Sequence, residues 1–218
     1  MSLSILELVQ KSLKGEALSF EQSHSFFSAV VKGEVEPVLL TALLVALKMR
    51  GETAEEIAGA AAAMRAAATE FPAAVVGAID CCGTGGDGSN TINISSTAAL
   101  VAASMGLPVA KHGNRSVSSQ SGSADLLEQL GINIQMSPQT AARALSQSNS
   151  SFLFAPLYHA GIKHAMPVRT ALKSRTIFNL LGPLINPAKP DFQLLGVYDP
   201  ALTPVMAQAL QQLGVKAA

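Results

Sequence analysis

The stretch CGTGGDG, residues 82–88, is the part of the sequence that most strongly indicates the fold. Its glycines let the backbone turn tightly and approach a ligand, with N–H groups free to face anionic oxygens. The stretch follows a short apolar run, 74–80, which we expect to be a strand, and leads into a helix expected from about Ser96 to Met105. A helix N-terminus favours phosphate through its unpaired amides and its dipole. The loop therefore favours phosphate binding, with a plain tight turn as the alternative.

This glycine loop differs from the common nucleotide-binding loops. No acidic residue ends the next expected strand, as a dinucleotide site requires, and no Gly-Lys-Ser/Thr follows, as in a Walker loop. Small hydrogen-bonding side chains instead stand where the next helix begins: Asn93, Ser95, Ser96 and Thr97.

Strands and helices alternate after the glycine loop. Further strands are expected at 108–111, 151–155 and 192–198, and helices lie between them, the last ending near Gly214. This alternation predicts an α/β domain with a mostly parallel sheet. Residues 215–218 look like the start of another strand. We therefore expect the chain to be truncated, with the C-terminal part of the α/β domain missing.

The first part of the chain, residues 1–72, is expected to form a small helical domain. Ser19 to Gln22 and Thr53 to Glu56 are capping boxes, which mark helix starts. Pro72 is expected to end the last of these helices. The predicted domains are thus 1–72, helical, and 73–218, α/β and incomplete.

Composition excludes several classes of protein. Lysine plus arginine equals aspartate plus glutamate, at 15 each, so the basic surplus of a nucleic-acid binder is missing. No apolar run is long enough to span a membrane, and the N-terminus does not resemble a secretory signal. Cys81 and Cys82 are adjacent and lack partners for a metal site, which favours small buried residues in a reducing cytoplasm.

A second polar loop, residues 111–119, follows the next expected strand. In a parallel sheet, ligands bind beyond the carboxyl ends of the strands, so this loop and the glycine loop are expected to converge on one ligand. Lys111 and Arg115 supply positive charge, and Ser118, Ser119 and Ser123 supply hydroxyls. A solvated surface loop is the alternative.

Later segments are less informative by themselves. Arg169 has the planar fork that suits a carboxylate, but taken alone it fits a surface or helix-terminus arginine better. His159 alone indicates a structural histidine. The block 176–187 contains Gly-Pro and Asn-Pro steps that fix turns, and the residues themselves do not reveal its role.

Taken together, these segments resemble the anthranilate phosphoribosyltransferase family. The resemblance covers nearly the whole chain and rests on these blocks: Gly83 to Gly88, Asn93 to Thr97, Lys111 to Arg115 with Ser118 and Ser119, Ser121 to Asp125, Arg169, and Arg175 to Pro187. The glycine loop is shared with pyrimidine nucleoside phosphorylases, whereas the Lys-His-Gly-Asn-Arg and Asn-Leu-Leu-Gly-Pro-Leu-x-Asn-Pro blocks are more specific. The family implies phosphoribosyl transfer from phosphoribosyl pyrophosphate (PRPP) to the amine of anthranilate in tryptophan synthesis. It also implies a cytoplasmic homodimer formed through the helical domain, with the segment near 166–187 packing on that domain.

The resemblance carries binding roles onto residues of this chain. It implies contacts to PRPP by Gly83, Gly86, Asp87, Thr91, Asn93, Ile94, Ser95, Ser96, Lys111, His112, Gly113, Asn114, Arg115, Ser116, Val117, Ser118, Ser119 and Ser123. It implies contacts to anthranilate by Gly83, Asn114 and Arg169, with His112 and His159 lining the approach. Mg²⁺ is the implied cofactor, with Ser95 as one ligand. No catalytic residue is clearly assignable, which agrees with an amine that is already neutral near pH 7 and needs positioning more than a strong base.

One departure affects the predicted activity. The family carries an Asp-Glu pair that binds magnesium later in its sequence, and this chain stops before it. We therefore expect the fragment alone to be weak or inactive. Two alternatives remain: a pyrimidine nucleoside phosphorylase-like enzyme and a non-catalytic relative that binds nucleic acid.

Overall fold

The computed structural model describes residues 3–73, 75–86, 88, 92–116 and 121–218. The chain divides into two compact units. The first consists of residues 1–68, 159–185 and 204–213, and the second of residues 69–158, 186–203 and 214–218. This division follows spatial contacts, and the sequence domains 1–72 and 73–218 stay a prediction.

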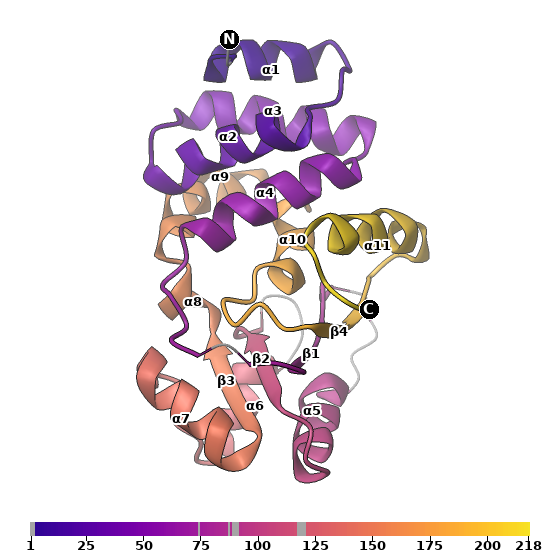
Figure 1. Cartoon of the computed structure of the whole chain (residues 1–218). Coiled ribbons are helices and arrows are strands. Elements are labelled where there is room, and N and C mark those ends of the chain that lie inside the picture. The colour runs from indigo at the N-terminus through magenta and orange to yellow at the C-terminus, as the bar shows by residue number, and fades with distance from the viewer. Residues whose placement is uncertain (1–2, 74, 87, 89–91, 117–120) are drawn as a thin grey trace. The chain divides into compact units, whose positions relative to one another are not determined.

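Helices build the first unit (Figure 1). The N-terminal ones are α1 (Ile5–Leu13), α2 (Phe20–Lys32), α3 (Pro37–Arg50) and α4 (Ala54–Ala66), and the later ones are η1 (Ala160–Ala165), α9 (Met166–Leu172), α10 (Phe178–Leu181), η2 (Gly182–Leu184) and most of α11 (Thr203–Gln212). The capping boxes at Ser19 and Thr53 are confirmed, because each hydroxyl accepts the N–H three residues on. A β-carbon on Gly59 would lie 2.3 Å from the Phe20 carbonyl oxygen, so α2 and α4 pack too closely for a side chain there.

The expected end of α4 at Pro72 is wrong. The helix ends at Ala66, with Ala67 as its cap. The backbone N–H of Thr69 then donates to the Tyr158 carbonyl, 2.8 Å away, within the second unit. The chain has therefore left helical geometry before the proline is reached.

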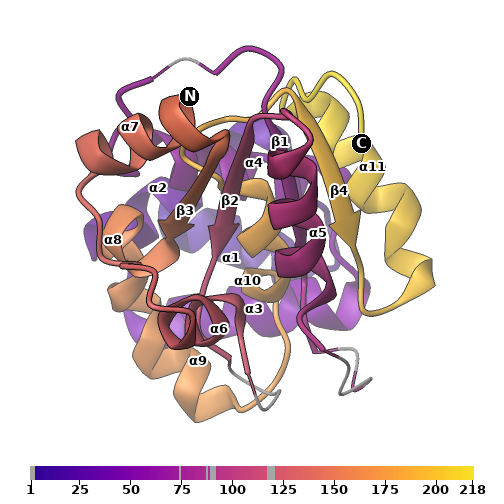
Figure 2. The ribbon, with the colours of Figure 1, turned by 90° about the horizontal axis from the view of Figure 1, so that it is seen from below.

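The second unit contains the parallel sheet that the sequence predicts. Its strands are β1 (Ile79–Gly83), β2 (Val109–Gly113), β3 (Ser150–Phe154) and β4 (Phe192–Gly196), and their order is β3-β2-β1-β4. Figure 2 shows them side by side and pointing the same way. The helices of this unit are α5 (Ile94–Ser104), α6 (Ser123–Gln129), α7 (Pro138–Ser148), α8 (Ala155–Tyr158) and η3 (Pro200–Leu202).

Two predicted strands need correction. Residues 75–78 form a turn rather than a strand, because the Gly77 N–H donates to the Asp191 carboxylate at 2.8 Å and Gly77 has a φ of +77°. The strand β1 instead runs through both cysteines. The strand β4 ends at Gly196, two residues early, because the Tyr198 N–H turns to the Thr84 hydroxyl at 3.0 Å.

Apolar side chains cover both faces of the sheet. Cys81 and Val109 pack with Ala99 and Ala103 of α5, and other groups of buried residues include Leu145 with Leu153 and Leu127 with Phe152. The chain end also touches the sheet, since Ala217 makes a parallel bridge to Phe192. No helix in the described part of the chain is long and apolar enough to cross a membrane.

Candidate active site

The glycine loop leaves the sheet at its carboxyl edge. Gly83 ends β1 opposite Gly196 of β4, and a β-carbon on Gly83 would lie 3.2 Å from the Gly196 carbonyl oxygen. Beyond it, Gly85, Gly86 and Gly88 have φ values of +67°, +74° and +72°. This left-handed backbone suits glycine, which adopts it without steric cost. Asp87 and Thr91, both predicted to contact PRPP, lie outside the described residues.

The helix α5 begins next to this loop, and its start is linked to Ser121, in the segment between β2 and α6 that contains the second loop. Asn93 is the N-cap of α5, and its amide nitrogen donates to the Ser121 hydroxyl at 3.2 Å. Ser95 is half-buried and Ser96 is buried in the first turn, whereas Ile94 is exposed. The structure thus brings the helix start and the second loop together, as an anion site at the sheet edge requires.

A buried polar cluster lies beneath the two loops. The Asp80 carboxylate accepts a hydrogen bond from the backbone N–H of His112 at 3.3 Å and another from the side-chain amide of Asn186 at 2.8 Å. The same Asn186 amide also donates to the Ala110 carbonyl at 2.8 Å. The Lys111 ammonium donates to the Cys81 carbonyl at 2.6 Å. Burial raises the pKa of Asp80, and the charge of Lys111 and these hydrogen bonds oppose that shift.

This cluster explains the Asn-Pro step of the block 176–187. Asn186 joins β1 to β2 near the starts of both strands, at Asp80 and Ala110, and so ties the two strands together from within the sheet. Lys111 is only 5% exposed, and its side chain compensates the charge of Asp80 from within the sheet.

The second loop leaves β2 at Gly113 and returns to α6. A β-carbon on Gly113 would lie 3.1 Å from the Ser123 hydroxyl, so Ser123 stands at the end of β2. The Asn114 carbonyl accepts the Ala124 N–H at 3.2 Å, and the Asn114 side-chain oxygen accepts the Arg115 N–H at 2.7 Å. Val117, Ser118 and Ser119, also predicted to contact PRPP, lie outside the described residues.

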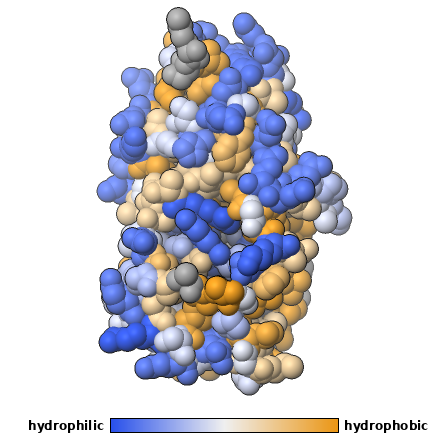
Figure 3. Space-filling model, in the orientation of Figure 1, coloured by the Kyte–Doolittle hydropathy of each residue, from blue (hydrophilic) through white to orange (hydrophobic). Residues whose placement is uncertain are grey.

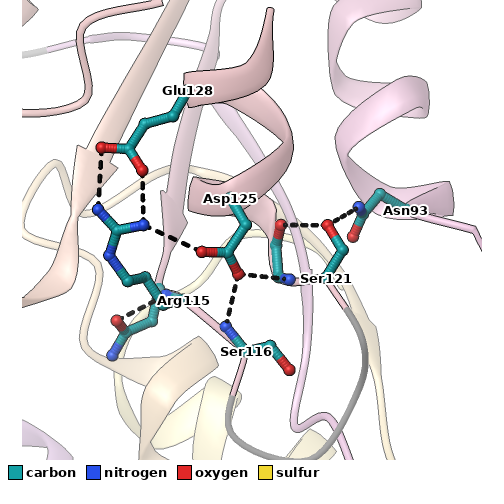
Figure 4. Close-up of polar contacts among 8 residues, drawn as sticks. Asn93, Arg115, Ser116, Ser121, Asp125 and Glu128 are labelled. Atoms are coloured by element: carbon teal, nitrogen blue, oxygen red, sulfur yellow. Dashed lines mark hydrogen bonds and ion pairs between the residues drawn. The ribbon is translucent and has the colours of Figure 1, made fainter.

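Arg115, predicted to give its charge to the ligand, pairs with two acids of α6 (Figure 4). Its guanidinium donates to Glu128 at 2.5 and 2.9 Å and to Asp125 at 3.0 Å. Hydrogen bonds with Glu128 and Asp125 raise the pKa of Arg115. In the described residues, the positive charge of Arg115 is therefore neutralised by carboxylates of the protein itself.

Two residues that were predicted to contact anthranilate belong to the first unit. His159 is 6% exposed, and burial lowers its pKa to about 4, so the imidazole is neutral at pH 7. The Arg169 guanidinium stands 5.2 Å from the centre of the Phe178 ring and donates to the Met166 sulfur at 3.7 Å. Among the ion pairs of the described residues, none includes Arg169.

Magnesium fits the described residues only as a companion of a phosphate ligand. Within the ranges that the structure describes, no three His, Cys, Asp or Glu side chains cluster to hold a metal. Mg²⁺ prefers oxygen and commonly binds one or two carboxylates together with substrate phosphates and water. The Ser95 hydroxyl, half-buried at the start of α5, stays the predicted protein ligand.

The sequence interpretation missed four residues that organise this site. Asp80 and Asn186 were hidden because their partnership joins residues 106 positions apart. Asp125 lies inside a block that the resemblance quotes, and Glu128 follows it by one helical turn, a spacing at which helical side chains are neighbours. That spacing was the available signal, but only the structure shows that both acids meet Arg115.

Two sequence models of one glycosyl transferase family match the chain. The helical bundle domain matches residues 6–68, and the a/b domain matches residues 76–218. Curated relatives include the anthranilate phosphoribosyltransferases of Pseudoalteromonas translucida (strain TAC 125) and Colwellia psychrerythraea (strain 34H / ATCC BAA-681). Each is 58% identical, over 99% and 100% of this chain and over 61% and 60% of the relative. The chain thus spans about three fifths of the length of these relatives.

Solved structures agree with the sequence comparison. Anthranilate phosphoribosyltransferase from Thermus thermophilus superposes with a TM-score of 0.92 at 47% identity, over 95% of this chain and 63% of that one. The enzyme from Saccharomyces cerevisiae, in complex with PRPP and Mg, superposes with a TM-score of 0.86 at 31% identity, over 97% of this chain and 63% of that one. These similarities support the predicted architecture of a helical part and an α/β part.

Proposed function

The chain belongs to the glycosyl transferase family of the two matching domain models, and we propose from this premise that it is part of an anthranilate phosphoribosyltransferase. The reaction moves the phosphoribosyl group of PRPP to the amine of anthranilate and releases pyrophosphate. The observation that carries the proposal is the hydrogen bond between Asn93 and Ser121, which holds the phosphate-favouring start of α5 against the second loop. The comparisons favour this function over the phosphorylase-like and nucleic-acid-binding alternatives.

PRPP occupies the carboxyl edge of the sheet in this proposal. The bond between C1 of the ribose and the pyrophosphate oxygen breaks, and negative charge builds on the leaving group. Backbone N–H groups of the glycine loop and the start of α5 stabilise that charge. The donor site comprises the predicted residues Gly83, Gly86, Asp87, Thr91, Asn93, Ser95, Ser96, Lys111, Ser119 and Ser123. Mg²⁺ bound to the pyrophosphate supplies further charge neutralisation, and the yeast relative in complex with PRPP and Mg supports this part.

Anthranilate is bound through its carboxylate in this proposal. Arg169 supplies a guanidinium that no ion pair of the described residues neutralises, and Gly83, Asn114, His112 and His159 are the other proposed contacts. The aromatic amine attacks C1 as the bond to pyrophosphate breaks, and it afterwards loses its proton to water. Positioning then accounts for much of the rate. We include a cytoplasmic homodimer, formed through the helical residues, in the same proposal.

An assay of the full-length protein tests the reaction. With PRPP, Mg²⁺ and anthranilate, we expect the loss of anthranilate fluorescence to match the release of pyrophosphate mole for mole. Omission of any one component should stop both signals. Phosphorolysis of uridine or thymidine, without pyrophosphate release from PRPP, would refute the proposal and favour the phosphorylase alternative.

A further inference from the structure

One carboxylate oxygen holds both ends of the second loop (Figure 4). The Oδ2 atom of Asp125 accepts the Ser116 N–H at 3.0 Å and the Gly122 N–H at 2.8 Å. The two N–H groups belong to residues on either side of 117–120, and the same oxygen binds both of them. Asp125 lies in the first turn of α6, and the helix therefore fixes the positions of Ser116 and Gly122 relative to each other.

The other oxygen of Asp125 is held by Arg115. The Nη1 atom of Arg115 donates to Asp125 Oδ1 at 3.0 Å, and both terminal nitrogens of Arg115 donate to Glu128. Asp125 and Glu128 are one helical turn apart on α6, where helical side chains are neighbours. Arg115 thus orients the Asp125 carboxylate from one side while the loop amides bind it from the other.

The two loop ends approach each other closely. A β-carbon on Gly122 would lie 2.3 Å from the Ser116 nitrogen and 2.9 Å from the Asn114 oxygen, so only glycine fits. Next to Gly122, the Ser121 hydroxyl accepts the bond from Asn93 at the start of α5. Asp125 therefore also affects the position of Ser121 and, through the bond to Asn93, the start of α5 that favours phosphate.

We propose that Asp125 is a positioning residue for the phosphoribosyl donor, and that Arg115 acts through Asp125 rather than on a phosphate group. The inference rests on the proposed function. Two carboxylates already surround the single positive charge of Arg115, and a phosphate would have to displace them. The bonds from the Ser116 and Gly122 N–H groups hold the pKa of Asp125 below its usual range, so the carboxylate that closes the loop is ionised at pH 7.

Steady-state kinetics of the full-length protein test the role of Asp125. Asp125→Ala should raise the KM for PRPP on the order of tenfold or more, the usual effect of losing charge-assisted hydrogen bonds. The KM for anthranilate should change less, because the Ala124 N–H holds the Asn114 carbonyl separately. Asp125→Asn keeps one acceptor oxygen and should lie between wild type and alanine, which protects the test if the alanine variant folds poorly.

A double-mutant cycle tests the role of Arg115. Arg115→Ala should raise the KM for PRPP in the wild-type background but change it by about twofold at most in the Asp125→Ala background, because coupled residues are not additive. Arg143→Ala, which removes an exposed arginine of α7, is the matched control and should behave as wild type. Hydrogen exchange at the Ser116 and Gly122 amides should accelerate in both loop variants but not in the control.

Additive effects of the two substitutions would show that Arg115 binds the donor itself and would overturn the proposal. Unchanged exchange and an unchanged KM for PRPP in Asp125→Asn and Asp125→Ala would also overturn it. A wild-type protein that does not use PRPP would refute the proposed function and the donor role together, whereas an active wild type with insensitive variants refutes only the role of Asp125.

Discussion

At the scale of single residues, Arg169 decides the proposed choice of acceptor. Its guanidinium lies against the Phe178 ring, which keeps the planar fork oriented without neutralising it. Arg169→Ala in the full-length protein should raise the KM for anthranilate by roughly ten- to a hundredfold, the equivalent of about 1.5–3 kcal/mol for a lost charge-assisted pair. The KM for PRPP should change much less.

Arg169→Lys is the control for charge without the fork. It should recover only part of the loss, because an ammonium cannot meet both carboxylate oxygens in one plane. If the KM for anthranilate and the KM for PRPP rose together, or neither rose, Arg169 would be structural and the acceptor site would have to be sought elsewhere.

His159 should make the free energy of unfolding depend on pH. Its pKa is lowered to about 4 by burial, against about 6.5 in an unfolded chain. Protonation therefore favours the unfolded state, and the contribution of the neutral imidazole, complete above about pH 6.5, is lost as the pH falls toward 4. This loss amounts to roughly 3 kcal/mol in total.

Urea unfolding at pH 7, 6 and 5 measures this dependence. His159→Gln should flatten the fall in the free energy of unfolding between these values, and His24→Gln, which removes a partly exposed histidine, is the matched control. A fall of the same steepness in His159→Gln and wild type would assign the acid sensitivity to other groups.

The sequence reveals the residues of the site more readily than their partners. Lys111 and Ser123 were predicted to lie near the carboxyl edge of the sheet, because strand ends in parallel sheets collect ligand-binding residues. The pairing of Arg115 with Asp125 and Glu128 was not predictable, because a basic residue in a polar loop looks the same whether it binds a ligand or an acid. Arg115 pairs with acids because the packing of α6 brings Asp125 and Glu128 next to it.

At the scale of elements, the order of strands and helices was predicted well and their ends were not. The turn at Gly77 depends on Asp191, which lies 114 positions away, and the end of β4 depends on Thr84. Local propensity contains neither contact. The parallel arrangement of the strands is confirmed. It was predictable because the alternation of strand and helix leaves few other topologies.

Asn186 joins two elements, and its removal should destabilise the sheet. Asn186→Ala leaves the Asp80 carboxylate and the Ala110 carbonyl buried without this donor, which should lower the free energy of unfolding by about 1–3 kcal/mol. Urea denaturation measures the change. Gln147→Ala removes an exposed amide of α7 and should stay within about 0.5 kcal/mol of wild type. Equal stability of the two variants would show that the Asp80 cluster does not stabilise the sheet.

At the scale of the whole molecule, the helical residues are the proposed association surface. Large apolar side chains are exposed there, among them Leu13 at 61%, Val38 at 74% and Met49 at 80%, and Figure 3 shows hydrophobic patches among hydrophilic residues over the N-terminal helices. Short helices cannot bury all of their apolar faces alone. We therefore expect a dimer.

Sedimentation velocity at micromolar concentration tests this expectation for the full-length protein. Met49→Glu should shift the protein toward monomer, whereas Leu130→Glu, which adds the same charge at an exposed leucine of the second unit, should not. A wild type that is monomeric at this concentration would refute the prediction.

Calorimetric titration of the full-length protein with PRPP in the presence of Mg²⁺ tests most directly whether the two loops form a site for the phosphoribosyl donor. We expect saturable binding at one site per chain, with ribose 5-phosphate binding at least about tenfold more weakly because it lacks the pyrophosphate that the helix terminus and glycine loop stabilise. Equal affinity for PRPP and ribose 5-phosphate, or no binding of PRPP, would contradict the proposed donor site.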